Sequence, residues 1–208
     1  MFSRSRLFLF AKLGMSALLL AGCLTSAPPA TLYDFGSIVP KMDEQVFPPD
    51  FPALDVSRVG APAWLQSTLI YYRQEQVNEQ QTRFYTQSRW NMVPSELIRE
   101  NIRAQIYAAG GSLGGGRAVH ADELRLVLYV QEFSHYFSSA TVSEGRFAFT
   151  AAISQKGEVI AQRAFYAAVP AKTPDAQGGV KALSEAVHAA TAEMLLWIVQ
   201  SHNQSGSR

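Results

Sequence analysis

The clearest secondary-structure pattern in this chain of 208 residues lies in Gly145-Arg146-Phe147-Ala148-Phe149-Thr150-Ala151-Ala152-Ile153-Ser154. Apolar side chains recur at every second position, which is the period of a β-strand. One face of this strand carries Phe147, Phe149, Ala151 and Ile153, and the other carries Ala148, Thr150 and Ala152. Gly157, within 155–158, predicts a tight hairpin into a second strand over 159–169.

Further strands are predicted on the N-terminal side of this hairpin. A long one is expected over 124–133, and the shorter ones are expected over 32–35, 54–59, 68–72 and 83–86. The residues 74–81 are polar and predict a turn, and the prolines within 40–52 predict a loop.

Two segments have the periodicity of amphipathic helices. The first begins at Pro94, repeats isoleucine every fourth residue from Ile98 to Ile106, and ends at Gly110-Gly111. The second is expected from about Val180, because glycine is costly inside a helix, although Thr173-Pro174-Asp175 offers an earlier start. Residues 203–208 are expected to fray. Together these elements predict a single α+β domain, with a mostly antiparallel or mixed sheet and two helices packed on one face.

The N-terminus has the composition of a secretory signal. It contains three basic residues and no acidic one, followed by an apolar run that ends in Leu20-Ala21-Gly22-Cys23. This tetrapeptide resembles the bacterial lipobox, in which the cysteine receives the lipid and becomes the first residue of the mature chain. We therefore expect a lipoprotein signal peptide over 1–22, a lipidated tether over 23–31, the folded domain over 32–200 and a tail over 201–208. The alternatives are a buried cysteine behind an ordinary signal, and a retained transmembrane helix, for which the apolar span is short.

The tether and the residue after the cysteine bear on location. Residues 24–30 are small or proline and span at most about 25 Å when extended, so the domain is expected to work close to the membrane. Leu24 stands where an aspartate would favour inner-membrane retention. The periplasmic face of the outer membrane is therefore favoured over the inner membrane.

Composition excludes some function classes. Removal of residues 1–22 leaves 15 basic and 17 acidic side chains, a net charge of −2. Such a domain has no basic field for phosphates, so we expect no nucleic-acid partner. Cys23 is the only cysteine, so no internal disulfide can form.

Few residues have a pattern that indicates chemistry. Gly110-Gly111-Ser112-Leu113-Gly114 matches the G-x-S-x-G of serine hydrolases, but that motif requires a strand before the serine and a helix after it, the reverse of the order predicted here. None of the four histidines has metal-ligand spacing, so we expect no metal. The sequence has no cofactor signature and no catalytic constellation, so we also expect no cofactor and no catalytic residue. Arg89 and Trp90 precede the first helix and are candidates for a partner surface, with core packing as the alternative for Trp90.

Several of these features resemble the family of auxiliary lipoprotein components of ABC-type transporters. They are the lipobox at Cys23, the early strand Leu32-Tyr33-Asp34-Phe35, the spacing Tyr85-x₄-Trp90-x₃-Pro94, the strand over 124–133 and the alanine-rich last helix. The resemblance covers most of 33–198. It implies a non-catalytic protein whose partners are an MCE-domain protein and an ABC permease and ATPase, which move phospholipid between the membranes.

The function implied by the resemblance is to dock that transporter at the outer membrane. It is compatible with a homo-oligomer and with direct contact to phospholipid. Two alternatives stay open: a lipoprotein that assists assembly of an outer-membrane barrel, and an anchored hydrolase that uses Ser112.

Overall fold

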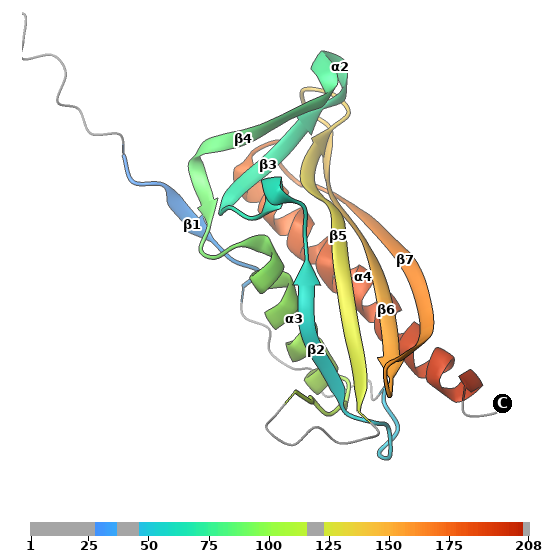
Figure 1. Cartoon of the computed structure of the whole chain (residues 1–208). Coiled ribbons are helices and arrows are strands. Elements are labelled where there is room, and N and C mark those ends of the chain that lie inside the picture. The colour runs from blue at the N-terminus through green and yellow to red at the C-terminus, as the bar shows by residue number, and fades with distance from the viewer. Residues whose placement is uncertain (1–27, 37–45, 116–122, 206–208) are drawn as a thin grey trace, which may run out of the picture.

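Three long antiparallel strands form the centre of the fold: β5 (Leu124–Phe137), β6 (Ser143–Gln155) and β7 (Glu158–Pro170) (Figure 1). The hairpin predicted between the last two is confirmed. Its two connecting residues, Lys156 and Gly157, both have positive φ, at 52° and 88°. This is the conformation of a type I′ turn, whose twist matches that of the flanking strands. The computed structural model describes residues 28–36, 46–115 and 123–205.

The other strands complete a seven-stranded mixed sheet on the far side of β5. Two of them, β2 (Leu54–Gly60) and β3 (Leu69–Gln74), both pair parallel with β5, β2 along its first half and β3 along its last residues. Next to β3 lies the antiparallel β4 (Glu79–Trp90), and β1 (Thr31–Tyr33) pairs parallel with β4 at the edge. The predicted α+β class with a mixed sheet is confirmed.

Short helical turns replace two of the expected connections. A 3₁₀ turn, η1 (Ala63–Leu65), joins β2 to β3. The polar turn expected over 74–81 is instead the single-turn helix α2 (Glu75–Asn78), after which β4 begins at Glu79. The structure therefore has three α-helices within the described residues, where the sequence predicted two.

The first long helix, α3 (Pro94–Ala108), starts and ends as its sequence predicts. Pro94 occupies the first turn, and Glu96 in the same turn forms an ion pair of 2.6 Å with Arg99. Ile98, Ile102 and Ile106 are fully buried. Gly110, with φ of 79°, follows the last turn and ends the helix.

The second long helix, α4 (Ala176–Ser205), begins earlier than glycine propensity suggested. Asp175 caps it, because its Oδ1 accepts the Gly178 N–H at 2.8 Å. Gly178 and Gly179 both lie inside the helix. Glycine is required at these two positions, because neither has room for a side chain. A Cβ atom on Gly179 would lie 2.3 Å from Nδ1 of His135 in β5. The helix also continues to Ser205, through part of the expected tail.

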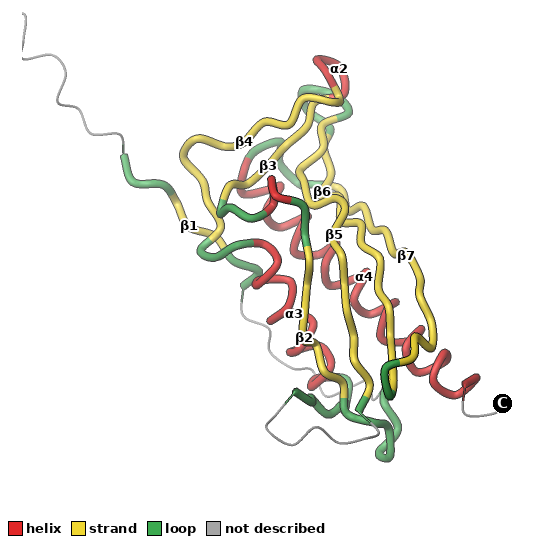
Figure 2. The backbone as a smooth tube through the Cα atoms, in the orientation of Figure 1, coloured by secondary structure: helices red, strands yellow, loops and turns green. Residues whose placement is uncertain are grey.

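Both long helices lie on the same side of the sheet (Figure 2), where α4 packs on β5, β6 and β7 and α3 packs on β2. The core fills the space between them and the sheet. By length and composition α4 would be long and apolar enough to cross a membrane, but 56% of its most apolar window is buried against the domain, as in a core helix.

Candidate functional site

The second face of the sheet has no helix over it among the described residues. In β5, Leu126 and Leu128 point to the helices and are at most 1% exposed, whereas Val127 and Tyr129 are 38% and 49% exposed. Tyr166 of β7 is 57% exposed. An antiparallel sheet commonly has one face in solvent, and that face is then usually polar.

Between Arg125 at one end and Glu132 and Arg146 at the other, the exposed face of the three long strands carries no charged side chain. We call this surface the open face, and it consists of Val127, Tyr129, Gln131, Ala148, Thr150, Ala152, Gln162, Ala164 and Tyr166. The register places Tyr129 beside Thr150 and Thr150 beside Ala164. The short side chains of alanine and threonine make the middle of the open face flat. A flat, uncharged surface loses little solvation when a protein covers it, as at the centre of protein interfaces.

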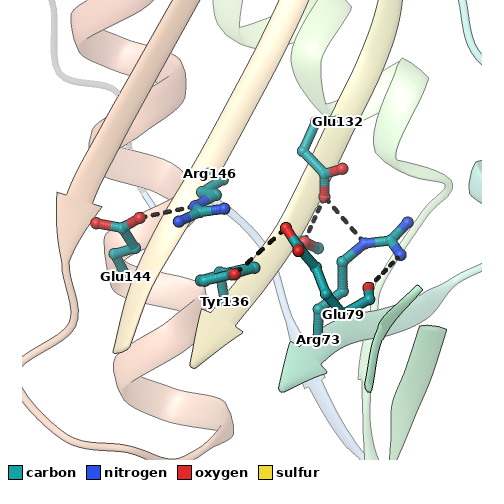
Figure 3. Close-up of polar contacts among 7 residues, drawn as sticks. Arg73, Glu79, Glu132, Tyr136, Glu144 and Arg146 are labelled. Carbon is teal, nitrogen blue, oxygen red and sulfur yellow. Dashed lines mark hydrogen bonds and ion pairs between the residues drawn. The ribbon is translucent and has the colours of Figure 1, made fainter. Parts of the chain in front are cut away.

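Charged residues bound the open face at the end where α2 lies (Figure 3). This polar cluster consists of Arg73, Glu79, Glu132, Ser134, Tyr136, Glu144 and Arg146. A β-bulge at Gln131 shifts the alternation of β5, so that Glu132, Ser134 and Tyr136 lie on the exposed side.

Ion pairs and stacking hold the polar cluster together. Arg73 Nε lies 3.7 Å from Glu132 Oε1, and the Arg146 Nε donates to Glu144 Oε1 at 2.7 Å. The Arg146 guanidinium lies 3.2 Å from the centre of the Tyr136 ring. These contacts bury Tyr136 to 4% exposure. Each of the two arginines thus forms an ion pair with a carboxylate of this chain, which makes the cluster a rim for the open face rather than an anion site.

A polar pair lies on the opposite, helix-covered face. The Tyr85 hydroxyl lies 2.8 Å from Nδ1 of His135, and the His135 ring lies against Gly179 in the first turn of α4. Burial lowers the pKa of His135 to about 4, against a smaller opposing effect of Asp175, and burial raises the pKa of Tyr85. His135 is therefore neutral at physiological pH, and it shares one hydrogen bond with the tyrosine hydroxyl.

The structure separates the two partner-surface candidates that the sequence placed side by side. Trp90 is 1% exposed and packs against Phe35 and Phe133, with ring centroids 5.5 Å away in each case. It is a core residue, so the alternative of core packing holds and a partner surface at Trp90 is wrong. Arg89 faces the other way, with its guanidinium 5.8 Å from the centre of the exposed Phe84 ring. The expected lipidation site, Cys23, lies outside the described residues.

The fold does not support the alternative of a hydrolase that uses Ser112. Ser112 is exposed in the loop after α3, where its carbonyl accepts the Leu54 N–H at 2.9 Å. A helix precedes it, as the sequence predicted, so it does not lie on a strand-to-helix turn. In the part of the chain that the structure describes, no three histidine, cysteine or acidic residues come together as metal ligands.

The sequence contained a signal for the open face that was not interpreted. The alternation puts Ala148, Thr150 and Ala152 on one face of their strand, and small uncharged side chains on a solvent-facing strand indicate a surface that another molecule can cover. His135 was considered only as a metal ligand, because its contact with Tyr85 joins residues 50 positions apart.

Comparison with known proteins gives one family. The family model described as "ABC-type transport auxiliary lipoprotein component" matches residues 33–195. No curated protein matches the chain in sequence.

Two solved structures are similar in fold. One is the crystal structure of a protein from Xanthomonas campestris assigned to the family DUF330, with a TM-score of 0.70 and 18% identity, covering 86% of this chain and 100% of that one. The other is the crystal structure of an uncharacterized protein, with a TM-score of 0.62 and 14% identity, covering 82% of this chain and 99% of that one. At these identities the likeness concerns the fold alone.

Proposed function

The chain belongs to the family of ABC-type transport auxiliary lipoprotein components, and from this premise we propose that it is the non-catalytic, lipid-anchored docking subunit of a transport system in the cell envelope. Its partners are an MCE-domain protein with an ABC permease and ATPase. It holds them at the periplasmic face of the outer membrane, where the system moves phospholipid.

Two sequence features support the anchor and the address. The lipobox ends at Cys23, and the residue that follows is Leu24 rather than aspartate. Three acyl chains on one cysteine hold a protein on a membrane essentially permanently. Attachment to one membrane raises the effective concentration of the domain for a partner that reaches that membrane.

The open face is the observation that carries the docking role. It is an uncharged surface formed by three strands, and the side chains of Tyr129 and Tyr166 lie half-exposed at its two sides. Tyrosine is enriched at protein interfaces because it offers a large contact area and a hydroxyl. The polar cluster then supplies charged residues at the rim, as expected for an interface of this type.

Purification of the full-length protein from its own membranes in mild detergent tests the partner. Mass spectrometry of the co-purifying proteins and lipids should recover an MCE-domain protein together with an ABC permease and ATPase. Recovery of an outer-membrane barrel without them would contradict the proposal and favour the barrel-assembly alternative. Bound phospholipid in the purified sample would indicate that this chain contacts the transported lipid itself.

A charged substitution locates the surface. Thr150→Lys places a cation in the centre of the open face, where burial under a partner would leave it unpaired. We expect this variant to fold and to lose most of the co-purifying partner. The matched control is Tyr107→Lys on α3, at a side chain that is 65% exposed on the other side of the sheet. Equal recovery of the partner with both variants would contradict docking through the open face.

A second substitution removes the hydrolase alternative. Ser112→Ala deletes the only hydroxyl of the G-x-S-x-G match and should leave partner recovery and envelope integrity unchanged. Loss of either, with an unchanged melting temperature, would indicate that the serine has a chemical role.

A further inference from the structure

A second surface lies at the β1 end of the same face of the sheet and meets the polar cluster at Arg73. We call it the aromatic–arginine band, and it consists of Leu32, Trp64, Tyr71, Arg73, Phe84 and Arg89. Successive contacts connect it. Leu32 of β1 pairs with Arg89 of β4, and Phe84 of β4 pairs with Tyr71 of β3. The Tyr71 ring meets Trp64 edge to face at 5.1 Å, and the Arg73 guanidinium lies 5.7 Å from the Trp64 ring centre.

An irregularity in β4 brings these residues onto the exposed side. Between the pairs Leu69–Arg89 and Tyr71–Phe84, β4 has three more residues than β3. The extra residues produce the sharp bend of β4 in Figure 1 and place Arg89 over the Phe84 ring. Arg89 stabilises the bend, because its Nη1 donates to the carbonyls of Tyr85 and Ser88.

The two exposed members of the band are apolar, and its other members, Trp64, Tyr71, Arg73 and Arg89, are half-buried. Leu32 is 65% exposed and Phe84 is 46% exposed. Among the described residues no carboxylate pairs with Arg89, whose Nη1 donates to backbone carbonyls only. Exposed leucine and phenylalanine, beside an arginine that has no carboxylate partner and next to tryptophan and tyrosine, are side chains that bind at the boundary between lipid headgroups and acyl chains.

The position of the tether favours a membrane over a protein as the occupant. Thr31 begins β1 and lies only eight positions after Cys23. Extended chain of that length spans at most about 29 Å, so a lipid on Cys23 keeps the β1 edge within that distance of the bilayer. The β7 edge is at the other end of the strand order and is the farthest strand from the tether.

We propose that the aromatic–arginine band lies on the phospholipid surface to which the chain is anchored, with Leu32 and Phe84 in the headgroup region and Arg89 on lipid phosphates. This inference rests on the proposed lipid anchor and adds to it a fixed orientation. The β1 edge faces the bilayer, and β5 to β7 extend away from it toward a partner.

Site-specific fluorescence in vesicles tests the contact. The full-length lipidated protein is reconstituted in vesicles of phosphatidylethanolamine and phosphatidylglycerol that contain a lipid with a nitroxide on its headgroup. A thioether-linked lipid blocks Cys23, so Phe84→Cys or Leu32→Cys provides the single reactive thiol for a dye. We expect quenching at both positions to be several-fold stronger than at the control Tyr107→Cys on α3.

Each outcome has a distinct meaning. Equal quenching at residues 84 and 107, in protein that floats with the vesicles, would overturn the band as a membrane contact while leaving the anchor intact. Dye labelling of the wild-type chain at Cys23, with no flotation, would instead overturn the anchor in the proposed function. Weak quenching at 84 that changes only when the transporter partner is added would overturn the proposal in favour of a protein occupant. Leu32→Cys repeats the test should Phe84→Cys not fold.

Discussion

At the scale of single residues, His135 makes the stability of the domain depend on pH. Its side chain is fully buried, and burial lowers its pKa from 6.5 to about 4. The unfolded chain therefore binds a proton between pH 6.5 and 4 that the native protein does not bind. The neutral, buried His135 therefore contributes its full stabilisation of the native state above pH 6.5. As the pH falls toward 4, this contribution is lost and the free energy of unfolding decreases by about 3 kcal/mol.

Substitution of His135 should remove this dependence. We expect His135→Gln to flatten the curve of unfolding free energy against pH between 6.5 and 4, as measured by urea denaturation. The control His188→Gln changes an exposed histidine of α4 and should keep the wild-type slope. An unchanged slope in His135→Gln would show that other groups cause the pH dependence.

Substitution of Gly179 by alanine should destabilise the protein, although helix propensity alone predicts a gain in stability. Alanine is ordinarily more stable than glycine inside a helix by about 1 kcal/mol. Here the added Cβ would lie 2.3 Å from the His135 ring, which Tyr85 holds in place. Overpacking of this kind costs about 1–3 kcal/mol, so we expect Gly179→Ala to lower the melting temperature. The exposed site Ala189 serves as the control, because Ala189→Gly should follow propensity alone; a Gly179→Ala variant more stable than wild type would contradict the close contact.

At the scale of elements, the start of α4 depends on Asp175. Its carboxylate accepts the Gly178 N–H at 2.8 Å and the Thr173 hydroxyl at 2.9 Å, and these bonds lower the pKa of Asp175. We expect Asp175→Ala to cost about 1 kcal/mol, the usual value of an N-cap, and to speed hydrogen exchange in the first turns of α4. Asp175→Asn keeps a capping oxygen and should retain most of the protection. Equal exchange in both variants would show that the cap is not what orders this end.

Elements with a local pattern could be predicted from the sequence, and elements that depend on distant contacts could not. The alternation around Phe147 and the isoleucines of α3 each report one buried face, so β6 and α3 are found where they were predicted. The start of α4 was missed because Gly179 owes its place to His135, a residue of another strand. Trp90 was left open between core and surface because its partners, Phe35 and Phe133, are far away in sequence.

The same limit applies to the surfaces. Arg89 was singled out beside a helix start, but its role in the band follows from the bend of β4 and from pairing with Leu32. The open face requires knowledge that both long helices lie on one side, which the order of elements suggests but does not establish for any particular strand. Residue alternation predicts that a strand has two faces. Only the packing shows which face stays in solvent.

At the scale of the whole molecule, the sheet presents its two exposed surfaces in different directions. Both lie on the side opposite the helices, but a sheet twists by about 20–25° from each strand to the next, and three such steps separate β4 in the band from β6 at the centre of the open face. Figure 1 shows β4 and β7 running in clearly different directions. A protein anchored at its β1 end can therefore rest the aromatic–arginine band on lipid while the open face points away from the bilayer.

This arrangement predicts that membrane contact and partner docking can be lost independently. Phe84→Asp should abolish lipid quenching at a dye on Leu32→Cys but leave partner recovery in detergent unchanged. Thr150→Lys should do the reverse. The two substituted strands, β4 and β6, are three steps apart in the strand order, about 14 Å, so their effects on stability should add in the double variant. If Phe84→Asp also removed the partner in detergent, with its melting temperature unchanged, the band would itself belong to the protein interface and the division of the sheet into a lipid-facing end and a partner-facing end would fail.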